Sequence, residues 1–235
     1  MVRITLDKPY IPIPVPVTAI KYGLLYNWYA ATDARNIAAE GWEVPTNTKI
    51  NTLVTFLGGS GVAGGKLNET GLTYWDTPNT GATNEVGFNL KAAGLRVNTT
   101  GVFGQLKGYA WIWTNTTSAI GNAFILNAYY NNDNTQLSGG PYAHGCSIRL
   151  IKTTTSLTHG QTGTYTGNDG KVYRTICIGT QEWLADNLCE TKFRNGDWIP
   201  GFDGGVYTPF GNAAWAALTT GALCAYNNDW SNVLI

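Results

Sequence analysis

The side chains that most often carry catalysis are scarce in this chain. Its 235 residues include two histidines, His144 and His159, and four cysteines. The cysteines are Cys146, Cys177, Cys189 and Cys224. Their spacing contains no CxxC pair of the kind that holds zinc, and the sequence lacks the HExxH, GxSxG and phosphate-loop motifs. We therefore expect no catalytic residue, no cofactor and no metal ion.

The acidic residues give no stronger signal for a metal. The carboxylates considered for calcium are Glu43, Glu69, Asp76 and Glu85. They are scattered, whereas calcium needs several clustered carboxylate and amide oxygens. A disulfide between the cysteines is an open alternative, but we expect free, buried thiols.

Binding is the chemistry that the polar residues favour. The segment Tyr130–Gly145 consists mainly of Asn, Gln, Ser, Gly and Tyr with one His, a composition that cannot build a core. Tyrosine gives a large contact area at low entropic cost, and Asn and Ser adapt their hydrogen bonds to a partner. An inert, solvated loop is the alternative, and His144 is then an ordinary surface residue. Our candidate ligand-binding residues are Trp111, Trp113, Tyr129, Tyr130, Asn131, Asn132, Asn134, Gln136, Tyr142 and His144.

Three apolar runs must position this segment. Tyr109–Trp113, Ala123–Tyr129 and Cys146–Ile151 have the length and the aromatic and β-branched composition of strands. Trp111 and Trp113 are two residues apart, so both point to the same face of their strand. Such a pair belongs either to the core or, with one ring partly exposed, to a ligand pocket.

The remaining sequence gives few helix signals. Thr46 is a suitable N-cap for a helix through Phe56. A second short helix is expected at Asn212–Leu218, with Asn212 as its cap, and Asp33–Glu40 could begin another.

Strand and loop signals fill most of the rest. Lys171–Ile178 and Gln181–Leu184 predict a strand pair across the turn Gly179-Thr180. The stretch between residues 61 and 90 is loop-like, and we expect Trp75 and Phe88 to hold it against the core.

Composition excludes some partners. Charged residues make up 13% of the chain, with 15 basic and 15 acidic side chains, so no basic excess favours nucleic acid. No run approaches the roughly 20 apolar residues of a membrane span. We expect neither nucleic-acid binding nor membrane insertion.

A proline-rich arm begins the chain. Ile11–Ile20 is apolar, but its prolines prevent the helix that a signal peptide needs, and no clear cleavage site follows. Residues 1–21 are expected to be extended, either as a strand on their own domain or as a docking arm inserted into another protein. The candidate docking residues are Tyr10, Ile11, Pro12, Ile13, Pro14, Val15, Pro16 and Val17. Without a signal peptide, the protein would be cytosolic or would leave the cell by another route, such as lysis.

Two groups of motifs resemble those of a known family. The first group is DGKVY at 169–173, IGTQEWLADNL at 178–188 and AWAAL at 214–218. The second is YGLLYNWYA at 22–30, GWEVPT at 41–46, GGKL at 64–67, NEVGF at 84–88 and SIRLIK at 147–152. Together they resemble the Fibrobacter succinogenes major paralogous domain. The resemblance implies a variant of the C-type lectin fold, shared with sulfatase-modifying-factor relatives and with the hypervariable ligand binders of phage diversity-generating retroelements.

The order of the motifs departs from that family. There the DGKVY block comes first, whereas here it follows the YGLLYNWYA block, which indicates a circular permutation. We expect an α+β, C-type-lectin-like fold, rich in strands and loops with about two short helices. Residues 22–152 and 169–235 would pack into one domain, with 153–168 as a linker or hairpin. Completion of the domain between subunits is the alternative.

The resemblance and the arm together suggest a function. We expect a non-enzymatic binding module of a bacteriophage virion, such as a head fibre, decoration or tail-tip protein, located on the virion surface and trimeric. It would dock on a capsid or other virion protein through its arm and recognise a host surface glycan or protein. The competing expectation is a secreted or cell-surface bacterial adhesin or glycan-binding protein.

Overall fold

The computed structural model of the chain describes residues 18–234. The helices are α1 (Trp28–Ala31), α2 (Asn47–Phe56), α3 (Ala63–Leu67) and α4 (Asn212–Ala216), followed by 3-10 turns at Tyr226–Asn228 and Trp230–Asn232. The strands are β1 (Leu25–Tyr26), β2 (Trp42–Glu43), β3 (Ala93–Arg96), β4 (Phe103–Leu106), β5 (Tyr109–Ala119), β6 (Asn122–Tyr129), β7 (Thr135–Pro141), β8 (Ile151–Lys152), β9 (Thr162–Thr166), β10 (Val172–Ile178), β11 (Gln181–Leu184), β12 (Phe202–Asp203), β13 (Val206–Tyr207) and β14 (Leu223–Cys224). The predicted α+β, strand-rich class is confirmed, with four short helices in the described range rather than about two.

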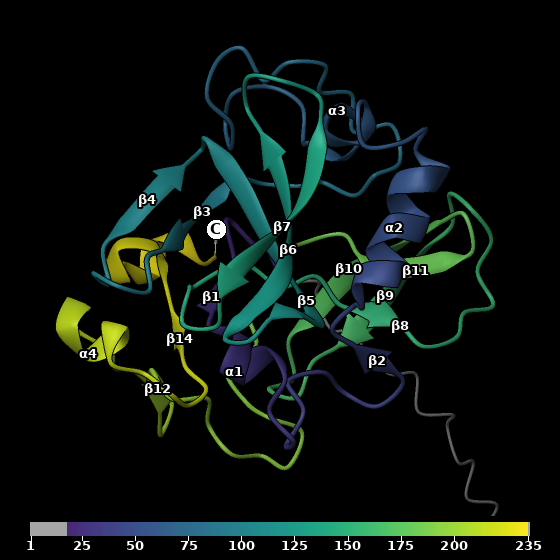
Figure 1. Cartoon of the computed structure of the whole chain (residues 1–235). Coiled ribbons are helices and arrows are strands. Elements are labelled where there is room, and N and C mark those ends of the chain that lie inside the picture. The colour runs from purple at the N-terminus through teal and green to yellow at the C-terminus, as the bar shows by residue number, and fades with distance from the viewer. Residues whose placement is uncertain (1–17, 235) are drawn as a thin grey trace, which may run out of the picture.

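The largest sheet joins the two parts of the chain. Its five strands are antiparallel in the order β2-β8-β11-β10-β9 (Figure 1). The predicted strand pair is confirmed as the hairpin of β10 and β11, in which Ile178 lies opposite Gln181. β9 belongs to the stretch 153–168 and forms one edge of the sheet. Residues before 153 and after 168 therefore share one hydrogen-bonded layer.

A separate three-stranded sheet, β5-β6-β7, carries the predicted binding segment. Two of the predicted strands are confirmed, because Tyr109–Trp113 lies in β5 and Ala123–Tyr129 lies in β6. The third prediction, Cys146–Ile151, is wrong for most of its length. Cys146 makes an isolated bridge to Tyr26 and Ser147 makes one to Ile112, so this buried run crosses between two layers instead of extending along one strand.

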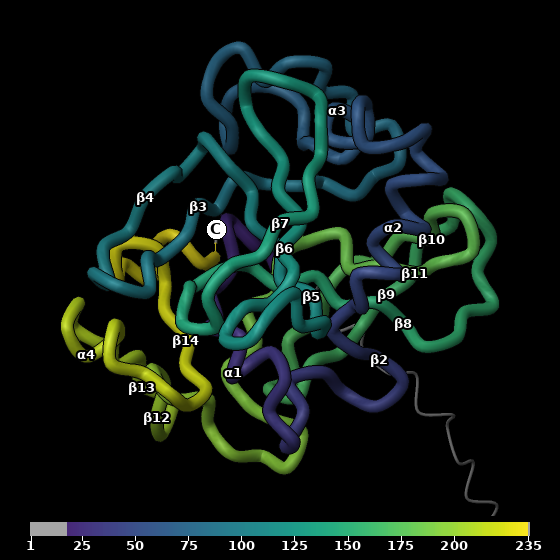
Figure 2. Tube along the Cα trace, viewed as in Figure 1, coloured from purple at the N-terminus to yellow at the C-terminus, as the bar shows by residue number. Residues whose placement is uncertain are grey.

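The two ends of the described chain meet. β1 pairs with β14, Ile20 forms a bridge to Leu234, and the amide of Tyr22 donates to the carbonyl of Asn232 at 3.0 Å. Figure 2 shows the purple segment after residue 18 running beside the yellow C-terminal segment. The first and last strands of the described chain therefore pair within one molecule.

The predicted N-cap of α2 is confirmed. The Thr46 side chain accepts a hydrogen bond from the amide of Lys49, and the helix spans Asn47–Phe56. The prediction for α4 is wrong in two respects: Gly211 is its N-cap position and Asn212 its first residue, and the helix ends at Ala216, before Leu218. Asp33–Glu40 forms turns and bends instead of a helix, since the Asp33 carboxylate bonds the Arg35 amide and so stabilises a local turn.

The interior is rich in large aromatic side chains. Trp75, Trp113, Trp183 and Trp215 are fully buried, and Phe88 is buried beside Trp183. The expected anchoring of the stretch 61–90 by Trp75 and Phe88 is thus confirmed, but the stretch is not all loop, because it contains α3. All four cysteines are buried and free, as predicted. Across residues 18–234, no helix is long and apolar enough to cross a bilayer.

The candidate docking residues Tyr10–Val17 lie outside the described residues.

Candidate functional site

The predicted binding residues converge in part on one aromatic face of the β5-β6-β7 sheet. This aromatic face consists of Tyr109, Trp111 and Tyr129, with Tyr130 at its edge, and each ring is partly exposed. The Tyr109 ring stands edge-on to the other three, with centroid distances of 6.3 Å to Trp111, 5.2 Å to Tyr129 and 6.5 Å to Tyr130. Tyr109, which the prediction left out, is therefore the centre of the cluster.

Strand register explains why three of these rings share a face, whereas Tyr130 follows the end of β6 and packs against the core on the other side of the sheet. Tyr109 and Trp111 are two residues apart on β5, and Tyr129 of β6 lies directly opposite Tyr109. The Tyr129 hydroxyl donates to Oε1 of Gln136 on β7 at 2.9 Å. Burial is the main cause that raises the pKa of Tyr129 above its ordinary value. The predicted Gln136 thus forms the polar edge of the aromatic face.

A polar patch lies beside Trp111. Its cross-strand neighbour Asn127 is buried and donates through Nδ2 to Oγ of Ser138 at 2.6 Å. Among the described residues, the indole Nε1 of Trp111 and the Oδ1 of Asn127 are both buried without a hydrogen-bond partner. Buried polar atoms of this kind are uncommon in folded proteins. A donor and an acceptor therefore stand unsatisfied on adjacent residues of this face.

The opposite side of the same sheet holds the aromatic face rigid. Ala110 and Ile112 of β5 and Leu126 and Ala128 of β6 are buried in one hydrophobic core. Trp111 also packs against a second core, which contains Trp113 and Ile125. Side chains packed in this way have little freedom to rearrange.

The loop between β6 and β7 is also held in place. The Asn132 side chain accepts from the amide of Asn134 at 3.0 Å, which forms a local turn. Backbone atoms of Asp133 and Asn134 pack against Gly64 and Gly65 of α3, where a Cβ on Gly64 would lie 2.4 Å from the Asn134 carbonyl. Asn131 and Asn134 remain exposed at the surface of this anchored loop.

The prediction for Trp113 is wrong. Its side chain is fully buried, and its indole N–H donates to the carbonyl of Tyr26 at 2.8 Å. Trp113 points to the same strand face as Trp111, but it is part of a hydrophobic core that also contains Tyr26 and Ile125. The ring therefore belongs to the core and cannot contact a surface ligand.

Tyr142 and His144 lie apart from the aromatic face. Tyr142 stacks on Trp28 with centroids 4.1 Å apart. His144 accepts a hydrogen bond through Nδ1 from the amide of Asn98 at 3.1 Å, and burial lowers the pKa of His144 from 6.5 to about 4. His144 thus has a structural contact and is neutral near pH 7.

A second row of aromatic rings was not predicted. Trp198, Phe202, Trp230 and Tyr207 follow one another with centroid distances of 5.3, 5.3 and 5.0 Å, and each ring is partly exposed. The row includes residues of β12 and β13, at the lower left of Figure 1. Trp198, Phe202 and Tyr207 lie within one short segment, and this clustering of aromatic residues in the sequence could have predicted part of the row. Trp230 joins them only through the tertiary fold.

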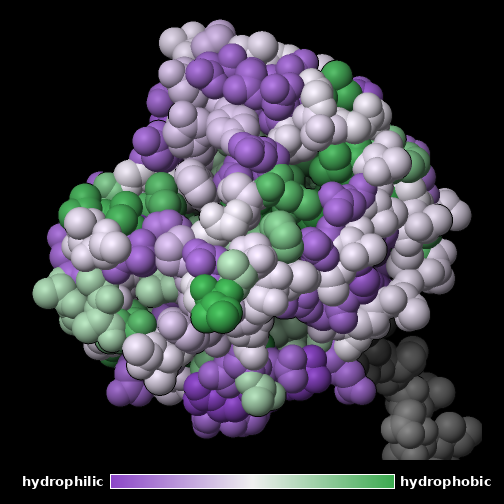
Figure 3. Space-filling view, viewed as in Figure 1, coloured by the Kyte–Doolittle hydropathy of each residue, from purple (hydrophilic) through white to green (hydrophobic). Residues whose placement is uncertain are grey.

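The surface chemistry agrees with polar recognition. Figure 3 shows a face that is mostly hydrophilic or neutral, with hydrophobic residues in separate small patches. Large apolar patches usually mark interfaces with other apolar surfaces. Within residues 18–234, no group of three or more His, Cys, Asp or Glu side chains is placed to hold a metal ion.

Comparison with known proteins gives one family. The model of the Fibrobacter succinogenes major domain matches residues 6–152 of this chain, more than half of its length. No curated protein and no solved structure matches it.

Proposed function

Because this chain belongs to the Fibrobacter succinogenes major domain family, we propose that it is a non-enzymatic binding module that recognises a surface glycan. One observation carries the proposal. Three partly exposed aromatic rings stand on a packed antiparallel sheet, with Tyr109 at their centre and Tyr130 at their edge. Rings on such a support offer large contact areas with little loss of conformational entropy on binding.

The polar atoms beside the rings favour a hydroxyl-rich partner over an apolar one. Gln136, which is hydrogen-bonded to Tyr129, is exposed beside the rings, and Asn131 and Asn134 are exposed on the adjoining loop, so accessible amides offer both donors and acceptors. A hydroxyl group both accepts and donates hydrogen bonds, so one hydroxyl can complement a donor and an acceptor together. A protein partner with Ser, Thr or Tyr at its contact surface is the alternative ligand.

The test is binding of the labelled full chain to an array of bacterial surface glycans. We expect retained binding for Trp198→Ala, which removes a partly exposed ring from the other aromatic row. The double variant Tyr109→Ala/Tyr129→Ala should lose about tenfold or more in affinity, because stacked aromatic contacts contribute on the order of 1 kcal/mol each. Binding that depends on Trp198 and not on Tyr109 and Tyr129 would overturn the assignment of the aromatic face.

The fold part of the proposal is a circularly permuted C-type-lectin-like domain. It is supported by the meeting of the two described ends, where Ile20 pairs with Leu234 and β1 pairs with β14. It is also supported by the shared sheet, since β8 of the family-matched part pairs with β11 of the later part. A chain reconnected at 234 and 20 and opened at 160, in the loop before β9, should fold with the same far-ultraviolet spectrum.

For the biological setting, we propose a trimeric component of a bacteriophage virion that docks through its N-terminal arm. The proline-rich, apolar composition of that arm supports this setting, because an extended segment of this kind can add to a sheet or groove of another protein. Antibodies against the protein should label phage particles. Labelling of the bacterial envelope alone would favour the competing assignment, a secreted or cell-surface adhesin.

A further inference from the structure

A polar cavity, lined by residues that belong neither to the aromatic face nor to the second row of aromatic rings, lies next to the first described residues. It has a volume of about 430 Å³ and is lined by Thr18, Ala19, Ile20, Glu69, Tyr74, Asn89, Lys91 and Arg174. This volume lies within the range of small-molecule sites. The walls come from four separate parts of the chain, and the lining offers both hydrogen-bond donors and acceptors around one aromatic ring.

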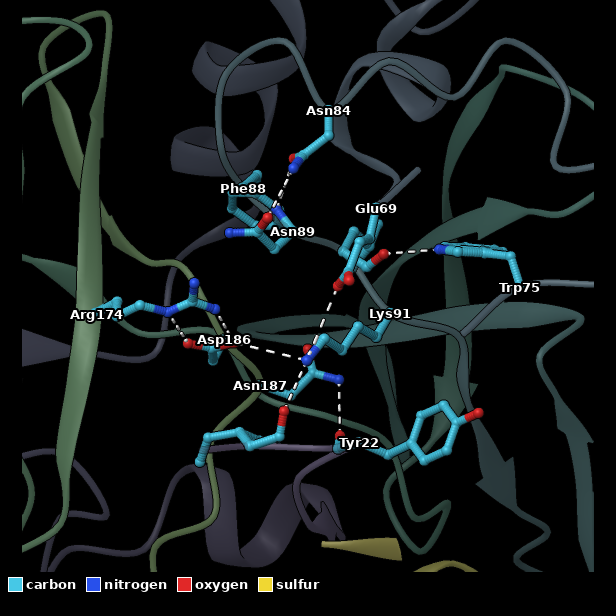
Figure 4. Close-up of polar contacts among 12 residues, drawn as sticks. Tyr22, Glu69, Trp75, Asn84, Phe88, Asn89, Lys91, Arg174, Asp186 and Asn187 are labelled. Atoms are coloured by element: carbon cyan, nitrogen blue, oxygen red, sulfur yellow. Dashed lines mark hydrogen bonds and ion pairs between the residues drawn. The ribbon is translucent and has the colours of Figure 1, made fainter. Parts of the chain in front are cut away.

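Lys91 is the central side chain of this cavity (Figure 4). Its side chain is 5% exposed, and its Nζ donates one hydrogen bond, at 2.7 Å, to the carbonyl of Ile20. The carboxylates of Glu69 and Asp186 each lie 3.8 Å from Nζ, beyond hydrogen-bond distance, and the ring of Tyr74 is 4.3 Å away. An ammonium has three donors. Within residues 18–234, Lys91 thus lacks hydrogen-bond partners for two of them.

The neighbours of Lys91 leave a positive charge uncompensated. Arg174 is paired with Asp186 through two hydrogen bonds of 2.9 and 2.7 Å. Arg149, which is fully buried behind the cavity, donates only to neutral acceptors: the side chain of Asn187 and the carbonyls of Phe88, Leu184 and Asn89. Three cationic side chains therefore face two carboxylates, Glu69 and Asp186.

Burial disfavours the charged forms of both Glu69 and Lys91. Desolvation is the main cause that raises the pKa of Glu69, and the same effect lowers the pKa of Lys91. Both shifts show that the groups are poorly hydrated here. An anion that entered the cavity would find a poorly solvated cation with unused donors, where charge-assisted hydrogen bonds are strong.

We propose that this cavity binds a sugar acid, that is, a monosaccharide unit with one carboxylate, such as a uronic acid. The carboxylate accepts hydrogen bonds from Lys91 and balances the excess positive charge. The sugar hydroxyls bond to the polar groups of Glu69, Asn89 and Thr18, which line the same space. The site uses none of the residues of the aromatic face, so it stands or fails independently of the function proposed above.

The experiment is isothermal titration of the full chain with D-glucuronate, with D-glucose as the neutral analogue and acetate as the carboxylate alone. We expect saturable glucuronate binding, at least about tenfold tighter than that of glucose or acetate, since one charge-assisted hydrogen bond gives roughly that discrimination. The variant Lys91→Met should lose at least about tenfold in glucuronate affinity. The control Lys66→Met removes a partly exposed lysine paired with Glu85 and should bind like the wild type.

Arg174→Gln is a second test that does not depend on whether the buried variant Lys91→Met folds, because the Arg174 side chain is 52% exposed. It should fold and weaken glucuronate binding by removing one positive charge from the rim. Three results would overturn the proposal: no saturable binding of glucuronate up to about 50 mM, equal affinity for glucose, or equal affinity for acetate. Unchanged glucuronate affinity in folded Lys91→Met would overturn it as well.

Discussion

Acidification should destabilise this protein through His144. Burial lowers the pKa of His144 from 6.5 to about 4, and its Nδ1 accepts a hydrogen bond from the Asn98 amide in the unprotonated state. The unfolded chain takes up a proton near pH 6.5, while the folded chain does so only near pH 4. The stability that His144 contributes is therefore fully present above pH 6.5 and is lost as the pH falls toward 4.

The magnitude follows from the difference between the two pKa values. One pKa unit corresponds to about 1.4 kcal/mol, so the loss reaches about 2 kcal/mol at pH 5 and about 3 kcal/mol at pH 4. These are upper values, because the His144 ring is partly exposed and solvent screens part of the effect. Urea unfolding at pH 7, 6, 5 and 4, followed by tryptophan fluorescence, measures the free energy of unfolding directly.

The matched variant is His144→Asn. The Asn side chain can place an oxygen near the position of Nδ1 and keep the acceptor for Asn98, but it does not titrate. Subtracting the unfolding free energy of His144→Asn from that of the wild type cancels the contribution of the other titrating groups. This difference should fall by about 2 kcal/mol between pH 7 and pH 5, because only the wild type loses stability through residue 144. His159→Asn, at the exposed histidine, controls for the loss of a histidine side chain. Parallel pH profiles for wild type and His144→Asn would refute this account.

Two further predictions concern stability. Thr46→Ala should lower the free energy of unfolding by about 1 kcal/mol, because the hydrogen bond from the Lys49 amide to the Thr46 cap is lost. Thr52→Ala, at an exposed position of the same helix, is its control in urea unfolding. Gly64→Ala should cost more than about 2 kcal/mol in spite of alanine's higher helix propensity, since the new Cβ would lie 2.4 Å from the Asn134 carbonyl. Gly61→Ala, where nothing lies within 4 Å, should change thermal stability little, and equal effects at both glycines would contradict the packing argument.

Local signals were sufficient for several elements of the fold. The Thr46 cap and the hairpin of β10 and β11 depend on residues within one turn of helix or one tight turn of chain, so the sequence alone predicts them. The alternation in β5 likewise identifies the strand face that carries Trp111. Alternation cannot predict how deeply each residue on that face is buried. Trp113 lies inside a core, whereas Trp111 packs against that core and stays partly exposed.

The parts of the site that sequence reasoning missed are those assembled from distant segments. Tyr109 becomes the centre of the aromatic face only through its register with Tyr129. Trp230 packs on Phe202 and Tyr207 although it lies well beyond both in the chain. Lys91 reads as an ordinary surface lysine in the sequence. Its burial results from the packing of Ile20, Glu69 and Asp186 around its end, none of which is near it in the chain.

Buried arginines explain how a chain with so many loops still forms defined surfaces. Loop carbonyls that are buried need donors that no strand or helix supplies. Arg149 provides them, because its guanidinium bonds Phe88, Asn89 and Leu184 carbonyls at 2.6, 2.8 and 3.0 Å. Its Nε also bonds Asn187, whose own amide donates to the Tyr22 carbonyl at 2.9 Å. One planar group, with its donors in a fixed fork, thus connects the loop before Lys91, the end of β11 and the start of the domain.

That connection gives the buried cation a functional consequence. Two of the segments that Arg149 ties together also form walls of the Lys91 cavity: the loop that contains Asn89, and the first described residues, which precede Tyr22. The cost of burying a guanidinium is visible in the pKa of Arg149, which burial lowers to about 9. A neutral residue of similar volume could fill the space, but it could not donate to carbonyls on two loops at once. The arginine thus fixes the geometry of the cavity and also adds to its positive charge, which links the stability of these loops to the chemistry of the site.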